Sequence, residues 1–199
     1  MLIHVVLAFA LFETLALAGV LLVWADRVAG ARLLAAFLVG IAIWITGNEL
    51  PNWFGPQAEP AMMALLATAP LTSALFFHFC VVFCRVQIGR TGVAAAYALG
   101  GAATLAAVLL VPGHIVQHKA IGWIAVANQV GWTASLAWVI LGIGGITVLL
   151  RSLVRASRPA FSQIAAVTAS CLWGMLCLTG YGMGVLDWPV YPLPLLGPP

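Results

Sequence analysis

The sequence predicts an all-α, polytopic integral membrane protein, a six-transmembrane-helix bundle with its N-terminus outside the cytoplasm. The composition carries the first part of this prediction, because 64% of the 199 residues are hydrophobic and only 7% are charged. Soluble domains carry about 25% charged residues, so this chain could not cover its surface with polar groups in water. Its apolar runs are longer than the roughly 10-residue strands of membrane barrels. Helices are the remaining way to satisfy backbone groups in lipid.

Six apolar segments are predicted to be helices that cross the membrane. The first lacks a basic residue before it and is too long for a signal peptide, so we interpret it as a helix. Residues 47–60 are rich in turn residues and are expected to form a loop. A domain over residues 1–187 is followed by a Pro/Leu-rich outer tail at 188–199. Its expected helices are residues 3–24, 31–46, 62–84, 92–111, 128–150 and 161–185.

The segment 62–84, closed by Arg85, is the one around which we expect the bundle to be organised. It contains Pro70, which should kink the helix or loosen its outer half, because proline lacks a backbone donor. It also places His78 among three phenylalanines. The next helix carries a stripe of small residues that lets another helix approach closely: Gly92, Ala96, Gly100 and Thr104.

The basic residues indicate the orientation. Connections rich in Lys and Arg face the cytoplasm in membrane proteins. On one side of the predicted bundle, Lys119 is the only basic residue. The other Lys and Arg residues lie in or beside the first, third and fifth connections, on the opposite side: Arg27, Arg32, Arg85, Arg90, Arg151, Arg155 and Arg158. Both termini are therefore expected outside. The tail is too short to cross, so it either lies along the interface or begins a seventh helix.

Two ionisable residues lie within the apolar runs. A carboxylate at the bilayer centre costs about 2.5–3.5 kcal/mol on insertion scales, which makes Glu13 a functional candidate. We expect it to face the bundle interior, either as a hydrogen-bonded acid that pins its helix or as a ligand or proton site. His78 is either a hydrogen-bonded core residue or a ligand, and its depth allows a contact with Glu13.

The outer mouth is expected to hold the most polar patch of the protein. Its members are Asn48, Glu49, Asn52, Gln57, Asn128, Gln129, Tyr181 and Asp187. The patch is either ordinary loop polarity or the place where a small ligand enters. In the second interpretation, Asn48, Glu49 and Asp187 are the ligand or proton candidates.

Metal and cofactor chemistry has little support in the sequence. His114 and His118 have i, i+4 spacing, which on a helix would put both rings on one face and make them weak metal candidates. Solvated histidines are the simpler interpretation. The four cysteines lie in apolar runs without the spacing of a disulfide framework or a zinc site, so we expect reduced packing residues. We expect no cofactor, no catalytic site and no nucleic-acid partner.

Three stretches also carry a family resemblance. They are Gly47-Asn48-Glu49-Leu50, the run Leu75-Phe76-Phe77-His78-Phe79 before a basic turn, and the segment 185–192. Their order resembles the N-terminal membrane region of bacterial sensor histidine kinases that begin with seven transmembrane helices. The resemblance implies a sensing role in the bacterial inner membrane. It does not carry over phosphotransfer, because these 199 residues contain neither the seventh helix nor the kinase of that family.

Three functions remain open at this point. The first is a membrane-embedded sensory module of a two-component-type signalling protein, which detects a signal at the outer face or in the membrane. The second is a non-catalytic transmembrane subunit of a larger complex, suggested by the small-residue stripe. The third is a small transporter, which would show inverted repeats and interrupted helices. The expected partners are the lipid bilayer and a second copy or another membrane chain.

Overall fold

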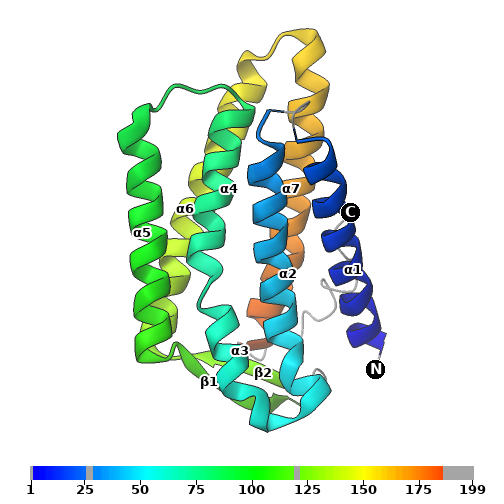
Figure 1. Ribbon diagram of the computed structural model, residues 1–199, viewed down its shortest axis with the longest axis vertical. Coiled ribbons are helices and arrows are strands. Elements are labelled where there is room, and N and C mark those ends of the chain that lie inside the picture. Colours follow the sequence, from blue (N-terminus) through cyan, green and yellow to red (C-terminus); the bar gives the residue numbers. More distant parts are fainter. Residues whose placement is uncertain (1, 26–28, 119–121, 186–199) are drawn as a thin grey trace.

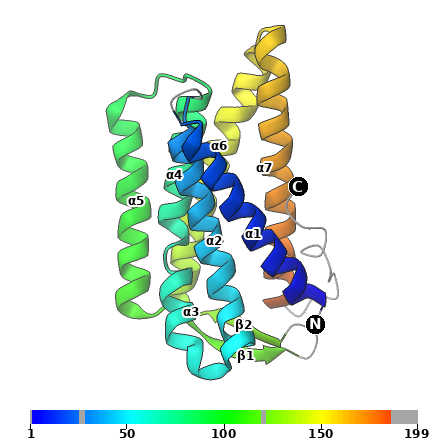
Figure 2. The same ribbon diagram turned by 45° about the vertical axis from the view of Figure 1, so that its right-hand side comes forward.

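The computed structural model describes residues 2–25, 29–118 and 122–185, and it shows a mostly helical protein with one small sheet (Figure 1). The helices run along one long axis, and a β-hairpin lies across one end (Figures 1 and 2). The elements are α1 (Leu2–Val23), α2 (Ala31–Phe54), the 3-10 turn η1 (Pro56–Ala58), α3 (Glu59–Leu66), α4 (Ala69–Phe83), α5 (Gly89–Leu110), β1 (Gly113–His118), β2 (Gly122–Ala127), α6 (Gln129–Arg155) and α7 (Arg158–Val185).

Within the described residues, 5 segments are long and apolar enough to cross a membrane. They are α1, α2, the stretch from η1 to the end of α4, α5 and α6. The helix α7 has 28 residues and corresponds to the sixth expected helix. The prediction of a helical bundle with membrane-length apolar segments is therefore confirmed.

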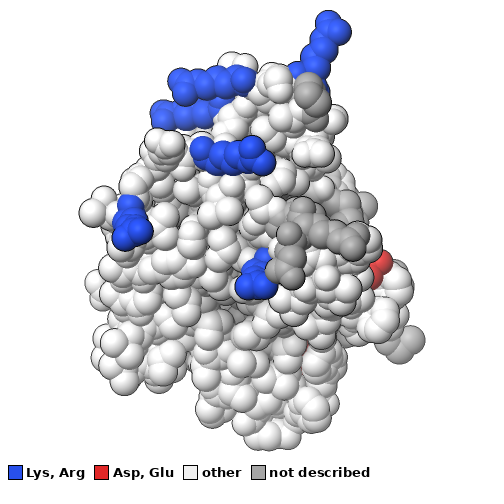
Figure 3. Space-filling view, turned by 45° about the horizontal axis from the view of Figure 1, so that its top comes forward, with Lys and Arg blue, Asp and Glu red and all other residues white. Residues whose placement is uncertain are grey.

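The two ends of the bundle differ in charge. The connections α1–α2, α4–α5 and α6–α7 meet at the end opposite the hairpin (Figure 1). Blue Lys and Arg side chains gather on that end in Figure 3, which we call the arginine end. Its described arginines are Arg32, Arg85, Arg90, Arg151, Arg155 and Arg158. Glu49 and Glu59 belong to the opposite end, which we call the hairpin end.

Helix α4 is the centre of the bundle, as the sequence predicts for the segment 62–84. It packs against α2, α5 and α6, and each of these neighbours offers a glycine where the helices touch. A Cβ added at Gly40 of α2 would collide with the side chain of Thr72. At Gly100 of α5, an added Cβ would lie 2.8 Å from the carbonyl oxygen of Pro70. At Gly145 of α6, it would lie 2.6 Å from the ring of Phe76. Close helix contacts of this kind replace hydrophobic driving force in lipid.

Pro70 interrupts the central segment, as predicted. The chain turns at Ala67 and Thr68, so that α3 ends at Leu66 and α4 begins at Ala69 with Pro70 in its first turn. Proline is well tolerated there because the first N–H groups of a helix have no intrahelical partner. The Leu71 N–H donates to Thr104 Oγ1 on α5, at 3.3 Å.

The small-residue stripe of α5 faces α4 of the same chain. Ala96, Gly100 and Ala107 are the buried residues of α5, and Gly100 and Thr104 contact the first turns of α4. The stripe therefore has an internal partner. Three described cysteines, Cys80, Cys84 and Cys171, are free and pack in or against an apolar cluster around Phe79.

Two expectations are wrong, the loop at residues 47–60 and the all-α fold class. Residues 47–60 do not form a loop, because α2 continues through Pro51 to Phe54 and a 3-10 turn follows. Packing outweighs the turn residues there: Gly47, Glu49 and Pro51 are buried, and an added Cβ at Gly47 would lie 3.0 Å from Leu65 Cβ. The segment after α5 forms an antiparallel hairpin in which β1 pairs with β2.

Candidate functional site

The hairpin end contains a buried acid that meets a histidine. Glu49 on α2 is only 2% exposed, and its Oε2 lies 2.6 Å from Nδ1 of His4, a side chain at the start of α1 that is 28% exposed. A buried carboxylate is costly unless it is hydrogen-bonded or paired. The separation of 2.6 Å is that of a hydrogen bond, so the histidine satisfies the buried carboxylate and joins α1 to α2.

The pair forms because α1 and α2 are antiparallel neighbours. The side chains of α1 that are buried have the spacing of one helix face, and α1 packs against α2. They are Leu7, Ala10, Thr14 and Ala18. The first turn of α1 is thereby placed beside the last turns of α2. Next to the pair, Leu7, Ile45 and Ile124 form an apolar cluster in which Ile124 comes from β2. The hairpin therefore covers the helix ends from which the pair extends.

Two side chains hold the hairpin in place. The Asn52 amide pairs with the backbone of Trp123: Nδ2 donates to the Trp123 carbonyl at 3.2 Å, and Oδ1 accepts from the Trp123 N–H at 2.7 Å. Glu59 Oε1 on α3 accepts from the Ile115 N–H at 3.2 Å. In the register of the hairpin, Trp123 is opposite Gln117 and Ile115 is opposite Ala125. Hydrogen-bonded and non-hydrogen-bonded pairs alternate along an antiparallel ladder, and these two pairs belong to the non-hydrogen-bonded set. The backbone N–H groups of Trp123 and Ile115 therefore point away from the partner strand. The two free edges of the hairpin are thus each capped by one side chain.

The other residues of the predicted outer patch have different roles. Asn48 Nδ2 donates to the Trp44 carbonyl, at 2.9 Å within α2. Asn128 caps α6, since its Oδ1 accepts from the Gly131 N–H at 3.0 Å. Asp187 lies outside the described residues. Of the three patch candidates, Glu49 is therefore the one that the structure places in a buried contact between helices.

The expected position of Glu13 is wrong. Its side chain is exposed on α1, which packs against α2, and not buried next to α4. The buried face of α1 is taken by small and apolar residues and by Thr14, whose hydroxyl donates to the Ala10 carbonyl. The contact between Glu13 and His78 that their depths would allow is not formed. The ring of His78 instead meets Tyr97 on α5, with 3.1 Å between Nδ1 and the Tyr97 hydroxyl.

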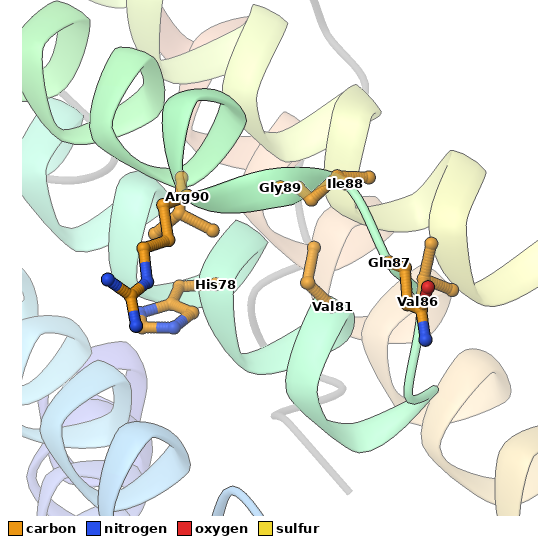
Figure 4. Close-up of a pocket in the computed structure, with 8 residues that line it drawn as sticks. His78, Val81, Val86, Gln87, Ile88, Gly89 and Arg90 are labelled. Atoms are coloured by element: carbon orange, nitrogen blue, oxygen red, sulfur yellow. The ribbon is translucent and has the colours of Figure 1, made fainter.

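His78 lines a groove at the arginine end, far from the His4–Glu49 pair. The groove has a volume of about 560 Å³ and lies between the last turns of α4, the connection to α5 and the first turn of α5. Figure 4 shows the Arg90 guanidinium beside the imidazole of His78. The remaining lining residues are Val81, Val86, Gln87, Ile88, Gly89 and Val93.

His114 and His118 lie on β1 and not on a helix. Their i, i+4 spacing therefore separates their backbone positions by about 13 Å, since a strand rises about 3.3 Å per residue. In the part of the chain that the structure describes, no three His, Cys, Asp or Glu side chains are placed to hold a metal ion. Their proposed role as metal ligands has no geometric support here.

The sequence prediction missed His4 as the partner of Glu49, and Arg90 as the neighbour of His78. Comparisons with protein-family models, with curated proteins and with solved structures give no match.

Proposed function

We propose that this chain is the membrane-embedded input module of a two-component-type signalling protein in the bacterial cytoplasmic membrane, and that the signal arrives at its hairpin end. The five apolar segments support a multi-pass placement. The arginines support an orientation with the arginine end in the cytoplasm and the hairpin outside. The Leu-Phe-Phe-His-Phe run and residues 47–50 support the link to sensor histidine kinases.

The single observation that carries this proposal is the His4–Glu49 pair beneath the hairpin. A titratable pair joining two helices changes its charge when a proton or cation arrives, and that change alters the free energy of the α1–α2 contact. From α2 the effect would reach α4 at the close contact between Gly40 and Thr72. Helix α4 then ends beside the connection to α5, at the arginine end. Densely packed helices are suited to carry such a displacement.

The two alternatives lose support. The subunit hypothesis was motivated by the small-residue stripe, whose partner is α4 of the same chain. The transporter hypothesis gains one feature, the interruption between α3 and α4. However, the exposed Leu71 N–H is bonded to Thr104, and the space beside the break, lined by Trp44 and Trp138, measures about 10 Å³. That volume holds about one water molecule and no larger solute.

Hydrogen–deuterium exchange in lipid nanodiscs tests the coupling. Glu49→Gln removes the negative charge at the pair, as protonation would, and should alter exchange at the hairpin and also in residues 84–88 and 156–157 of the arginine end. Glu13→Gln is the matched control, because it removes the same charge from an exposed position on α1. It should leave the arginine end unchanged.

A change confined to α1, α2 and the hairpin would contradict an input module, because nothing would reach the cytoplasmic end. The same would follow if both variants altered the arginine end equally, since the effect would then come from net charge and not from the pair.

A further inference from the structure

The groove beside His78 has the composition of an anion site at a membrane surface. Arg90 and His78 come from neighbouring helices and lie next to each other in the groove (Figure 4). In the described part of the chain, Arg90 has no acidic partner, and the ion pair that the structure contains is His4–Glu49 at the opposite end. The charge of Arg90 is therefore available to an anion. Arginine suits phosphate because its planar guanidinium donates two parallel hydrogen bonds.

His78 adds a second donor in the tautomer that carries the ring proton on Nε2, in which Nδ1 accepts from the Tyr97 hydroxyl. Its Nδ1 is occupied by the Tyr97 hydroxyl, and the two rings meet edge to face with their centroids 5.7 Å apart. These contacts fix the imidazole and leave Nε2 as the ring nitrogen available to a ligand. Gly89 and Arg90 also line the groove at the start of α5, a helix that has no side-chain cap. The first backbone N–H groups of a helix favour negative charge.

The depth and the walls of the groove fit a lipid. His78 lies five residues before the end of α4 at Phe83, which is about 7.5 Å along a helix that rises 1.5 Å per residue. The headgroup layer of a bilayer is about 5–8 Å thick on each side of the hydrocarbon core. Apolar side chains, Val81, Val86, Ile88 and Val93, make up the walls. Helix α5 lies at the edge of the bundle (Figure 1). Its side chains Leu99 and Leu105 are exposed.

We propose that this groove binds the phosphate headgroup of an anionic glycerophospholipid, such as phosphatidylglycerol, from the cytoplasmic leaflet. Arg90 and His78 bind the phosphate, and the valine and isoleucine side chains contact the upper acyl chain. The inference rests on the proposed membrane placement. It is independent of signal reception at the hairpin end, because it uses none of the same residues.

Lipid retention measured by native mass spectrometry tests the inference. The full chain, purified in mild detergent, is incubated with equal amounts of phosphatidylglycerol and phosphatidylcholine. The wild type should retain phosphatidylglycerol preferentially. Arg90→Gln should reduce that retention about five- to tenfold, the effect of about 1 kcal/mol or slightly more for one arginine at an anionic surface. Arg90→Lys should keep most of it. Arg155→Gln, another arginine at the same end, should match the wild type.

Equal retention of the two lipids, or equal retention by wild type and Arg90→Gln, would overturn the inference. Thermal stabilisation by inorganic phosphate as large as that by phosphatidylglycerol would assign the groove to a soluble anion and would also overturn it. Since the wild-type preference is measured first, a variant that does not fold leaves the inference testable. If the chain is found in membrane fractions but shows no lipid preference, the lipid site alone is refuted. If the chain is absent from those fractions, the membrane placement is refuted.

Discussion

Substituting alanine at two adjacent glycines of α5 tests the packing of the central helix. An added Cβ at Gly100 would meet the Pro70 carbonyl oxygen at 2.8 Å and Ala74 Cβ at 3.1 Å, whereas at Gly101 it would meet nothing within 4 Å. Backbone cannot move aside as a flexible side chain can. Overpacking typically costs about 1–3 kcal/mol. Both variants gain the same helix propensity, about 1 kcal/mol for alanine over glycine.

The propensity gain cancels when the two variants are compared. Gly100→Ala should therefore be less stable than Gly101→Ala by about 1–3 kcal/mol, the overpacking cost alone. The assay is reversible unfolding in mixed micelles of a mild detergent and sodium dodecyl sulfate, followed by tryptophan fluorescence. Gly101→Ala should unfold at a higher dodecyl sulfate fraction than the wild type. Equal unfolding midpoints for the two variants would refute the close contact between α4 and α5.

Three further predictions concern other contacts. Asn52→Ala should speed hydrogen exchange in β2, because the partly buried Trp123 N–H loses its acceptor, whereas Gln57→Ala should not. Unchanged exchange would show that Asn52 does not hold the hairpin. Thr104→Val should destabilise the chain by about 0.5–1.5 kcal/mol, the net contribution of the hydrogen bond that it removes from the Leu71 N–H. Thr133→Val, which loses only a bond within its own helix, should cost less, and equal unfolding midpoints would argue against this role of Thr104. Glu13→Leu should leave the chain as stable as the wild type or more stable in the same unfolding assay, since the Glu13 side chain is exposed. Marked destabilisation would indicate that Glu13 faces the bundle interior.

Apolar runs and single residues with strong local effects were predictable from the sequence. The membrane-length helices follow from hydrophobic composition, and the break before α4 follows from the missing donor of Pro70. The charge difference between the two ends follows from the positions of the arginines along the chain. Each of these features depends on a residue type and its place in the chain.

Features that depend on tertiary packing were not predicted. Turn residues between 47 and 54 favour a loop, but contacts with α3 keep this segment helical, as at Gly47 against Leu65. The hairpin was missed although Ile115, Val116, Ile124 and Val126 favour strands, because short apolar runs do not distinguish strand from helix.

One signal for the candidate site was present in the sequence. His4 and Glu49 lie at similar distances along the chain from the connection between the first two helices. Antiparallel neighbours place such positions side by side, so the pair could have been anticipated. The position of Glu13 could not, because one polar residue in a uniformly apolar helix does not determine which face is buried.

Both proposals require the hairpin end to face outside and the arginine end to face the cytoplasm. Labelling of intact cells with a membrane-impermeant maleimide tests this directly, with single cysteines introduced at two exposed positions, Gln117→Cys on β1 and Ser157→Cys between α6 and α7. The parent chain, whose three described cysteines are buried or half-buried, measures the background. The account predicts that Gln117→Cys is labelled in intact cells and Ser157→Cys only after lysis. Labelling of Ser157→Cys in intact cells, with Gln117→Cys protected until lysis, would contradict it.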